Sequence, residues 1–256
     1  MIVFAGPSLS HLETLPETLE PRAPVRQGDV YLAALEAPRA IGIIDGYFDG
    51  MPSVWHKEIL FALSRGIAVF GAASMGALRA AELDVFGMTG IGEIYAAYRD
   101  GTLRDDDEVA LAHGPEALGY PPLSLAMVNL RATCAAALRA GAIDATLAAR
   151  LLRAGKAQFF KDRTWRSVIA ALDLPEDRAR HLRGLIESHM VDQKARDAEA
   201  LLDRMAAADF PAPRSNFHFE RSDLWLRFTA QWRRRRAEPE AQSGGYRLLG
   251  EGGSFG

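Results

Sequence analysis

Short apolar runs alternate with helix-like segments over the first 115 residues of the chain. Four of these runs have the length of buried strands, at residues 1–5, 30–35, 40–44 and 67–70. Residues 52–65 lie between the last two runs and end at a glycine, which is typical of a covering helix. We therefore predict a Rossmann-like α/β core domain over residues 1–115, in which a mainly parallel sheet is flanked by helices.

The pattern changes near residue 115, and from Leu123 onward Ala, Leu and Arg recur at helical spacing. Helices are predicted at residues 123–140, 143–153, 164–173, 176–189, 192–208 and 220–236. Together they form a predicted helical domain over residues 116–240. The last segment, 241–256, is rich in glycine and serine and predicts a disordered tail.

The composition excludes several classes of function. Charged residues make up 25% of the chain and the net charge is −3, so no basic field indicates a nucleic-acid partner. Cys134 is the single cysteine, which excludes an internal disulfide and a cysteine-rich zinc site. No apolar run approaches the roughly 20 residues that span a bilayer. We expect a cytoplasmic protein that binds neither nucleic acid nor a membrane.

The most informative chemistry lies in residues 66–83, which read GIAVFGAASMGALRAAEL. A buried strand runs through small residues into strong helix-forming sequence, so Ser74 is predicted on a tight strand-to-helix turn. Backbone N–H groups of the helix start, near Met75 and Gly76, would lie beside its hydroxyl. This arrangement presents a nucleophile next to donors for an oxyanion. The pattern departs from the nucleophile elbow at one position, because residue 72 is Ala where Gly is expected.

Three predicted loops, at residues 6–9, 45–49 and 71–76, leave strands at the carboxyl edge of the sheet. Open α/β sheets bind ligands at this edge. Candidate residues for the same rim are Gly6, Ser8, Asp45, Gly46, His56, Lys57 and Glu58. His56 would open onto the rim from the first turn of the next helix, where it could act as a general base.

Each candidate also has a purely structural interpretation. A serine at a helix start is commonly an N-cap, which contributes about 1 kcal/mol. His56 has apolar neighbours at helical spacing and could be a satisfied core histidine. Asp45 could be a turn residue or could orient the histidine. Arg79 and Glu82 are three residues apart on a helix and could pair at the surface.

An acidic run at residues 105–108 could bind a hard cation through carboxylate oxygens. The alternative is an acidic helix start, which the helix dipole favours. Because the run lacks regular metal-loop spacing, we favour the second interpretation and expect neither a metal nor a cofactor. Residues 87–92 give a weak phosphate-loop signal, and the arginine run 233–236 is typical of a solvated helix face.

Several segments of the first 120 residues together resemble the TfuA-like proteins. The segments are GPSL at 6–9, IGIIDGYF at 41–48, PSVWHKEIL at 52–60, VFGAASMGALRAAEL at 69–83, FGM at 86–88 and DDEVA at 106–110. The resemblance implies an accessory role in backbone thioamidation of peptides or proteins, beside a YcaO-type ATP-dependent cyclodehydratase. It further implies that the protein releases sulfide from a thiocarboxylated ubiquitin-fold sulfur carrier, for use by the YcaO partner.

Hydrolysis of a thiocarboxylate is acyl transfer, which needs a nucleophile, a base and oxyanion donors. We assign Ser74 as nucleophile and His56 as base, with Asp45 or Glu58 to orient the histidine. Lys57 or Arg79 would hold the anionic carrier tail. Two alternatives stay open: a non-catalytic docking or allosteric partner of the YcaO enzyme, and a metal- or nucleotide-dependent enzyme that uses the acidic run.

Overall fold

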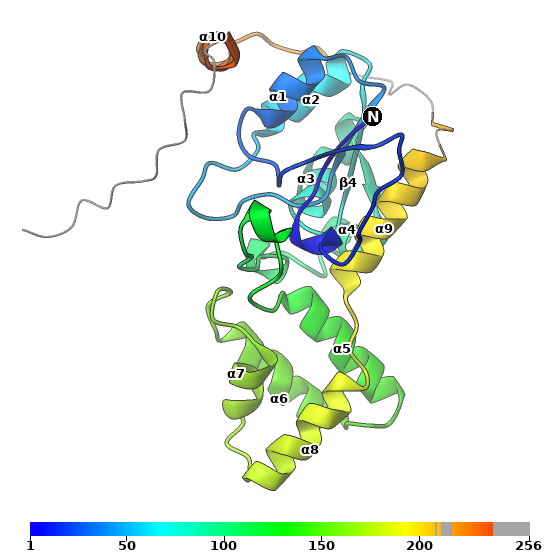
Figure 1. Ribbon diagram of the computed structural model, residues 1–256, viewed down its shortest axis with the longest axis vertical. Coiled ribbons are helices and arrows are strands. Elements are labelled where there is room, and N and C mark those ends of the chain that lie inside the picture. Colours follow the sequence, from blue (N-terminus) through cyan, green and yellow to red (C-terminus); the bar gives the residue numbers. More distant parts are fainter. Residues whose placement is uncertain (208, 211–216, 238–256) are drawn as a thin grey trace, which may run out of the picture. The chain divides into compact units, whose positions relative to one another are not determined.

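The computed structural model describes residues 1–207, 209–210 and 217–237 (Figure 1). The chain divides into two compact units, Met1–Phe219 and Glu220–Gly256. The predicted tail, 241–256, lies outside the described residues. The predicted domain boundary at residue 115 falls within the first unit and stays a prediction.

The first unit contains a five-stranded sheet in which every pairing is parallel, in the order β2-β1-β3-β4-β5. The strands are β1 (Ile2–Phe4), β2 (Glu20–Arg22), β3 (Ala40–Ile43), β4 (Ala68–Ala72) and β5 (Thr89–Ile91). In the register, Val3 pairs with Gly42, and Gly42 with Phe70. The predicted parallel α/β sheet is therefore confirmed, and the three predicted central strands are neighbours. Their carboxyl ends meet at one edge.

Helices cover both faces of this sheet. On one face, α9 (Gln193–Ala206) packs its apolar side chains against β1, β3 and β4, in a core that includes Val3, Phe70 and Leu201. Gly42 makes this packing possible, because a Cβ there would lie 2.6 Å from the Met205 sulfur. The helices α2 (His56–Ser64) and α3 (Met75–Leu83) contact β4, and α4 (Gly92–Arg99) contacts both α3 and α9 (Figure 1).

One predicted strand is wrong: residues 30–35 lie in a helix, α1 (Asp29–Leu35). Its composition, DVYLAAL, explains the error. Four of its seven residues are buried, so the segment shows the continuous apolar run of a buried strand, while Leu and Ala favour the helix. The edge strands β2 and β5 were not predicted, because neither shows an apolar pattern.

The predicted helical region is confirmed over the described residues that follow the sheet. Its helices are α5 (Met127–Arg139), α6 (Ala145–Lys156), α7 (Trp165–Ala170) and α8 (Glu176–Glu187). They share a core that includes Leu130, Leu151, Val168 and Leu182. In the second unit the structure describes α10 (Asp223–Ala237).

Candidate active site

The turn between β4 and α3 places Ser74 in an unusual conformation. Ala73 has a φ of +64°, a left-handed conformation that costs a residue with a Cβ roughly 1–3 kcal/mol. Ser74 occupies the N-cap position of α3, but its side chain makes no capping hydrogen bond. The structural interpretation of Ser74 as an ordinary cap therefore does not describe its hydroxyl, which is buried and directed elsewhere.

Lys194, near the start of α9, is the partner of that hydroxyl. Its Nζ donates to Ser74 Oγ at 3.1 Å and to the Val109 carbonyl at 2.9 Å. The Lys194 side chain is 2% exposed, and burial lowers the pKa of its ammonium. Asp45 and Asp192 act in the opposite direction. A lysine held towards its neutral form beside a serine hydroxyl has the arrangement of a general base and its nucleophile.

Asp45 is also buried at this place, and it organises the first loop. Its Oδ2 accepts hydrogen bonds from the backbone N–H groups of Gly6, at 3.0 Å, and Ser8, at 2.9 Å. Its Oδ1 accepts from Ser8 Oγ at 2.7 Å and lies 3.7 Å from Lys194 Nζ. The structure thus brings together four sequence candidates, Gly6, Ser8, Asp45 and Ser74, around a lysine that sequence reasoning missed.

His56 has different partners. Its Nε2 lies 2.7 Å from Glu82 Oε2 and 3.4 Å from Arg79 Nη1. Arg79 and Glu82 pair across one helical turn at 2.7 Å, and the His56 side chain is 42% exposed. No hydrogen bond joins His56 to Ser74 in the described part of the chain.

Glu58 and Lys57 also have partners away from Ser74. Glu58 is fully buried and accepts hydrogen bonds from the N–H groups of Gly28, Tyr31 and Trp55 at 2.8–3.2 Å. Desolvation raises the pKa of Glu58 to about 7. Lys57 Nζ lies 5.6 Å from the centre of the Phe219 ring. Glu58 therefore caps the starts of α1 and α2.

The predicted glycines serve close packing. A Cβ on Gly76 would lie 1.7 Å from the Ile43 carbonyl oxygen, and one on Gly46 would lie 2.9 Å from Met75. The N–H of Gly76 donates to the Ile44 carbonyl at 3.2 Å, so it is already engaged. Met75 is the first residue of α3, and its N–H has no acceptor within the helix. Of the two predicted oxyanion donors, Met75 is therefore the better placed.

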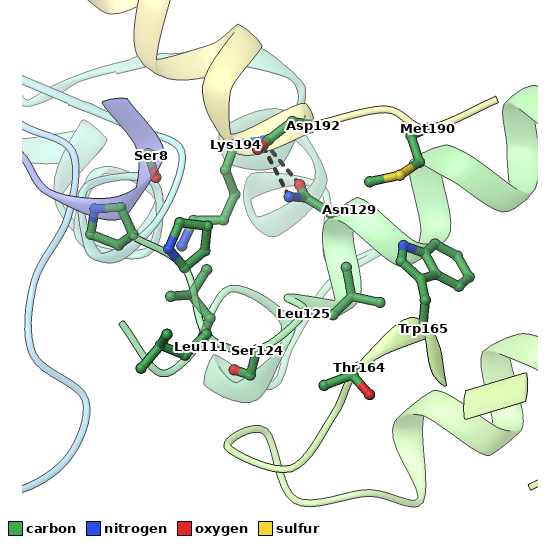
Figure 2. Close-up of a pocket in the computed structure, with 13 residues that line it drawn as sticks. Ser8, Leu111, Ser124, Leu125, Asn129, Thr164, Trp165, Met190, Asp192 and Lys194 are labelled. Carbon is green, nitrogen blue, oxygen red and sulfur yellow. Dashed lines mark hydrogen bonds between the residues drawn. The ribbon is translucent and has the colours of Figure 1, made fainter. Parts of the chain in front are cut away.

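A pocket of about 280 Å³ reaches this cluster from the side of the helical region (Figure 2). Its walls include Ser8, Leu125, Trp165, Met190 and Lys194, whereas neither Ser74 nor His56 lines it. Figure 2 shows that Asn129 of α5 is hydrogen-bonded to the start of α9. Its amide nitrogen donates to Asp192 at 2.9 Å, and its amide oxygen accepts from the backbone N–H of Lys194 at 3.1 Å. The pocket thus lies between the loop that follows β1 and the helices α5 and α7.

The acidic run is held by cations of the helical region. One oxygen from each of Asp105, Asp107 and Glu108 could meet at a metal ion. In this structure the Lys156 ammonium contacts all three carboxylates, at 2.9 Å for Asp105 and 3.0 Å for Glu108. Arg131 adds two hydrogen bonds to Glu108 at 2.8 and 2.9 Å. A protein cation therefore occupies the place that a metal would take.

Sequence reasoning could not have selected Lys194. It is 120 positions from Ser74, and its sequence neighbourhood is that of an ordinary helix start. Only the packing of α9 on the sheet brings its amine to the turn.

In a comparison with known protein families, residues 45–164 match the family described as TfuA-like protein. This segment belongs to the TfuA-like family. The family suggests an accessory role in thioamidation, and it is associated with YcaO partnership. The TfuA-like segment contains Asp45, Ser74 and Val109, whereas Lys194 lies beyond it. None of the curated proteins matches the chain. No helix in the described residues combines the length and apolar character needed to cross a membrane.

Proposed function

We propose that this protein hydrolyses the thiocarboxylated C-terminus of a ubiquitin-fold sulfur carrier and delivers the sulfide to a YcaO partner. The single observation that carries the proposal is the buried contact between Lys194 Nζ and Ser74 Oγ, at 3.1 Å. The family supplies the thioamidation setting. The buried pair supplies the chemistry, because acyl transfer needs an activated hydroxyl in a site from which water is largely excluded.

In the first half of the reaction Ser74 Oγ forms a bond to the thiocarboxylate carbon, and its proton passes to the neutral amine of Lys194. The carbon–sulfur bond then breaks, and sulfur leaves with the electron pair. Lys194 returns the proton to the sulfur, so the products are HS⁻ and a carrier acyl ester on Ser74. Charge is conserved, since one anion enters and one anion leaves.

In the second half a water molecule attacks the ester. Lys194 takes a proton from the water and passes it to Ser74 Oγ as the carbon–oxygen bond to the serine breaks. The carrier leaves with an ordinary carboxylate, and its acid proton goes to solvent. The Met75 N–H is our candidate donor to the oxyanion in both halves, because it begins α3 beside Ser74.

The pocket of Figure 2 suits the tail of such a carrier. Its volume of about 280 Å³ falls just below the range typical of drug-sized ligands, so it favours a short extended segment of small residues. Lys194 lies at its wall, and an N–H of its neutral amine can donate a hydrogen bond to the anionic thiocarboxylate. Ser8, fixed by Asp45, forms part of the same wall.

We assign the base to Lys194 rather than to the predicted His56. A base must come within hydrogen-bond reach of the proton that it removes. Lys194 meets this condition at Ser74, whereas His56 is engaged with Glu82 at 2.7 Å and is more than two-fifths exposed. Asp45 then acts on Lys194 and on the loop with Ser8, not on the histidine.

The test is the sulfide liberated from purified thiocarboxylated carrier. We expect the wild type to release sulfide and Ser74→Ala to lose several powers of ten in rate, because it lacks the nucleophile. Ser64→Ala, at the end of α2, is the matched control and should equal the wild type. A brief reaction quenched in acid should also leave the carrier as an ester on Ser74, visible as added mass. Equal rates for wild type and Ser74→Ala would favour a docking or allosteric partner of the YcaO enzyme.

A further inference from the structure

The Val109 carbonyl touches both members of the Ser74–Lys194 pair. It accepts the hydrogen bond from Lys194 Nζ at 2.9 Å, and a longer one from Ser74 Oγ at 3.5 Å. Val109 is itself fully buried. This carbonyl is therefore the third group of the site, in the position that an orienting group takes beside a general base.

The chemistry of an amine explains why such a group matters. A neutral lysine has two N–H donors and one lone pair, and only the lone pair can take the proton of Ser74. An acceptor that holds one N–H direction restricts where the lone pair points. With Val109 fixed at 2.9 Å, rotation of the amine is limited and its lone pair can be aimed at Ser74 Oγ.

Val109 directly follows the acidic run, whose 3₁₀ turn (Asp106–Glu108) is fixed by side chains of the helical region. The Glu108 side chain is 4% exposed and accepts hydrogen bonds from Arg131 of α5 at 2.8 and 2.9 Å, and from Lys156 of α6 at 3.0 Å. Arg163, which is fully buried, bonds to Asp107 at 3.0 Å. Bidentate guanidinium–carboxylate bonds of this kind fix geometry as well as adding energy.

We propose that Glu108 is a positioning residue of the hydrolytic site, held by Arg131 and Lys156 so that the Val109 carbonyl stays against Lys194. The inference rests on the proposed function, and it gives Arg131 and Lys156 a role in catalysis although neither lines the pocket. The acidic run then does more than begin a helix: it transmits the position of α5 and α6 to the amine of Lys194.

Arg131 is the residue at which to test this. Its side chain is 41% exposed, so its removal exposes no core, and the protein should still fold. Arg131→Ala should lower kcat for sulfide release by about 10- to 100-fold, the scale of a small misplacement at a reacting centre. KM should stay within about twofold, because Arg131 does not line the pocket. Arg131→Lys, which keeps the charge and one donor, should recover part of kcat.

The matched control is Arg183→Ala, which removes an arginine–glutamate pair in α8 that does not touch the acidic run. It should keep the wild-type kcat. If Arg131→Ala does not fold, as judged by thermal unfolding, Glu108→Gln serves instead, since it keeps the shape and removes the charge. Wild-type kcat in the folded variant, or a loss confined to KM, would overturn the proposal.

A second readout separates this inference from the proposed function. A small fluorophosphonate reacts with activated serines by forming a phosphorus–oxygen bond and losing fluoride, and it needs no carrier. The wild type should be labelled on Ser74, and Arg131→Ala should be labelled about 10- to 100-fold more slowly. If the wild type is labelled but releases no sulfide, the carrier assignment fails while the positioning role is still decided by the labelling rates. Equal labelling rates would overturn the role of Glu108.

Discussion

Lys194 Nζ lies 3.1 Å from Ser74 Oγ, although 120 positions of sequence separate the two residues. The serine lies in a strained turn after β4, and the lysine lies at the start of α9, which packs on one face of the sheet. Both side chains are buried, so the contact depends on α9 being seated on the sheet. The environment of the Ser74 hydroxyl therefore depends on tertiary packing and not on its local motif alone.

The rate of sulfide release should rise with pH through the pKa of Lys194. Only the neutral amine accepts the proton of Ser74, and burial places this pKa below the ordinary lysine value of 10.5. The negative charges of Asp45 and Asp192 act on the amine and limit how far its pKa is lowered. A profile of kcat from pH 5 to 9 at constant ionic strength checks this. A rate that falls as pH rises over that range would contradict a neutral lysine base.

Glu58 should make the protein less stable as pH rises from about 4.5 to 7. Its folded pKa, about 7, lies above its ordinary value, so in this window the native state binds a proton that the unfolded state has lost. Glu58→Gln removes this dependence, and its single amide oxygen can still accept from the Gly28 and Tyr31 N–H groups, although the Trp55 N–H loses its acceptor. Denaturant unfolding measures the free energy of unfolding at pH 5 and at pH 8. This free energy should fall more in the wild type than in the variant, by at most about 3 kcal/mol. The same fall in both proteins would rule the effect out.

Gly76→Ala should destabilise the fold strongly. The new Cβ would lie 1.7 Å from the Ile43 carbonyl oxygen, and backbone cannot move away as a flexible side chain could. We expect a loss of more than about 3 kcal/mol, above the usual cost of overpacking. Gly184→Ala in α8 is the control, since nothing lies near its Cβ. It should gain about 0.5–1 kcal/mol from helix propensity. Thermal unfolding of the two variants should move in opposite directions.

A chelator should leave the activity unchanged. Lys156 contacts all three carboxylates that could form a cation site, and its charge already balances part of theirs. Sulfide release before and after treatment with EDTA should therefore agree. Loss of activity that returns on adding Mg²⁺ would instead support the metal-dependent alternative.

The central sheet could be predicted from sequence because its buried strands are short apolar runs, with residues 40–44 and 67–70 close to β3 and β4. The turn at Ser74 could be predicted because a strand pattern changes to a helix pattern within three small residues. The strand predicted at residues 30–35 was wrong because all six of these residues are apolar, so the sequence carries no helical period, although α1 buries only Val30, Tyr31, Ala33 and Ala34.

The partners of the candidate residues could not be predicted in the same way. His56 and Lys194 look alike in sequence, because each is a basic residue in the first turn of a helix. What separates them is burial, which depends on contacts between distant segments: the histidine side chain is 42% exposed and the lysine side chain 2%. The acidic run was ambiguous for the same reason, since Arg131, Lys156 and Arg163 come from elsewhere in the chain.

The most direct test compares Lys194→Met with His56→Gln in the sulfide-release assay, at saturating thiocarboxylated carrier. Methionine keeps the length and burial of the lysine side chain without its amine, so folding should be preserved while the base is lost. We predict that Lys194→Met loses several powers of ten in rate. His56→Gln should stay within about twofold of the wild type, because it gives up only a partly exposed pairing with Glu82. A folded Lys194→Met with wild-type rate, or a severe loss in His56→Gln alone, would contradict the assignment of Lys194 as the base of Ser74.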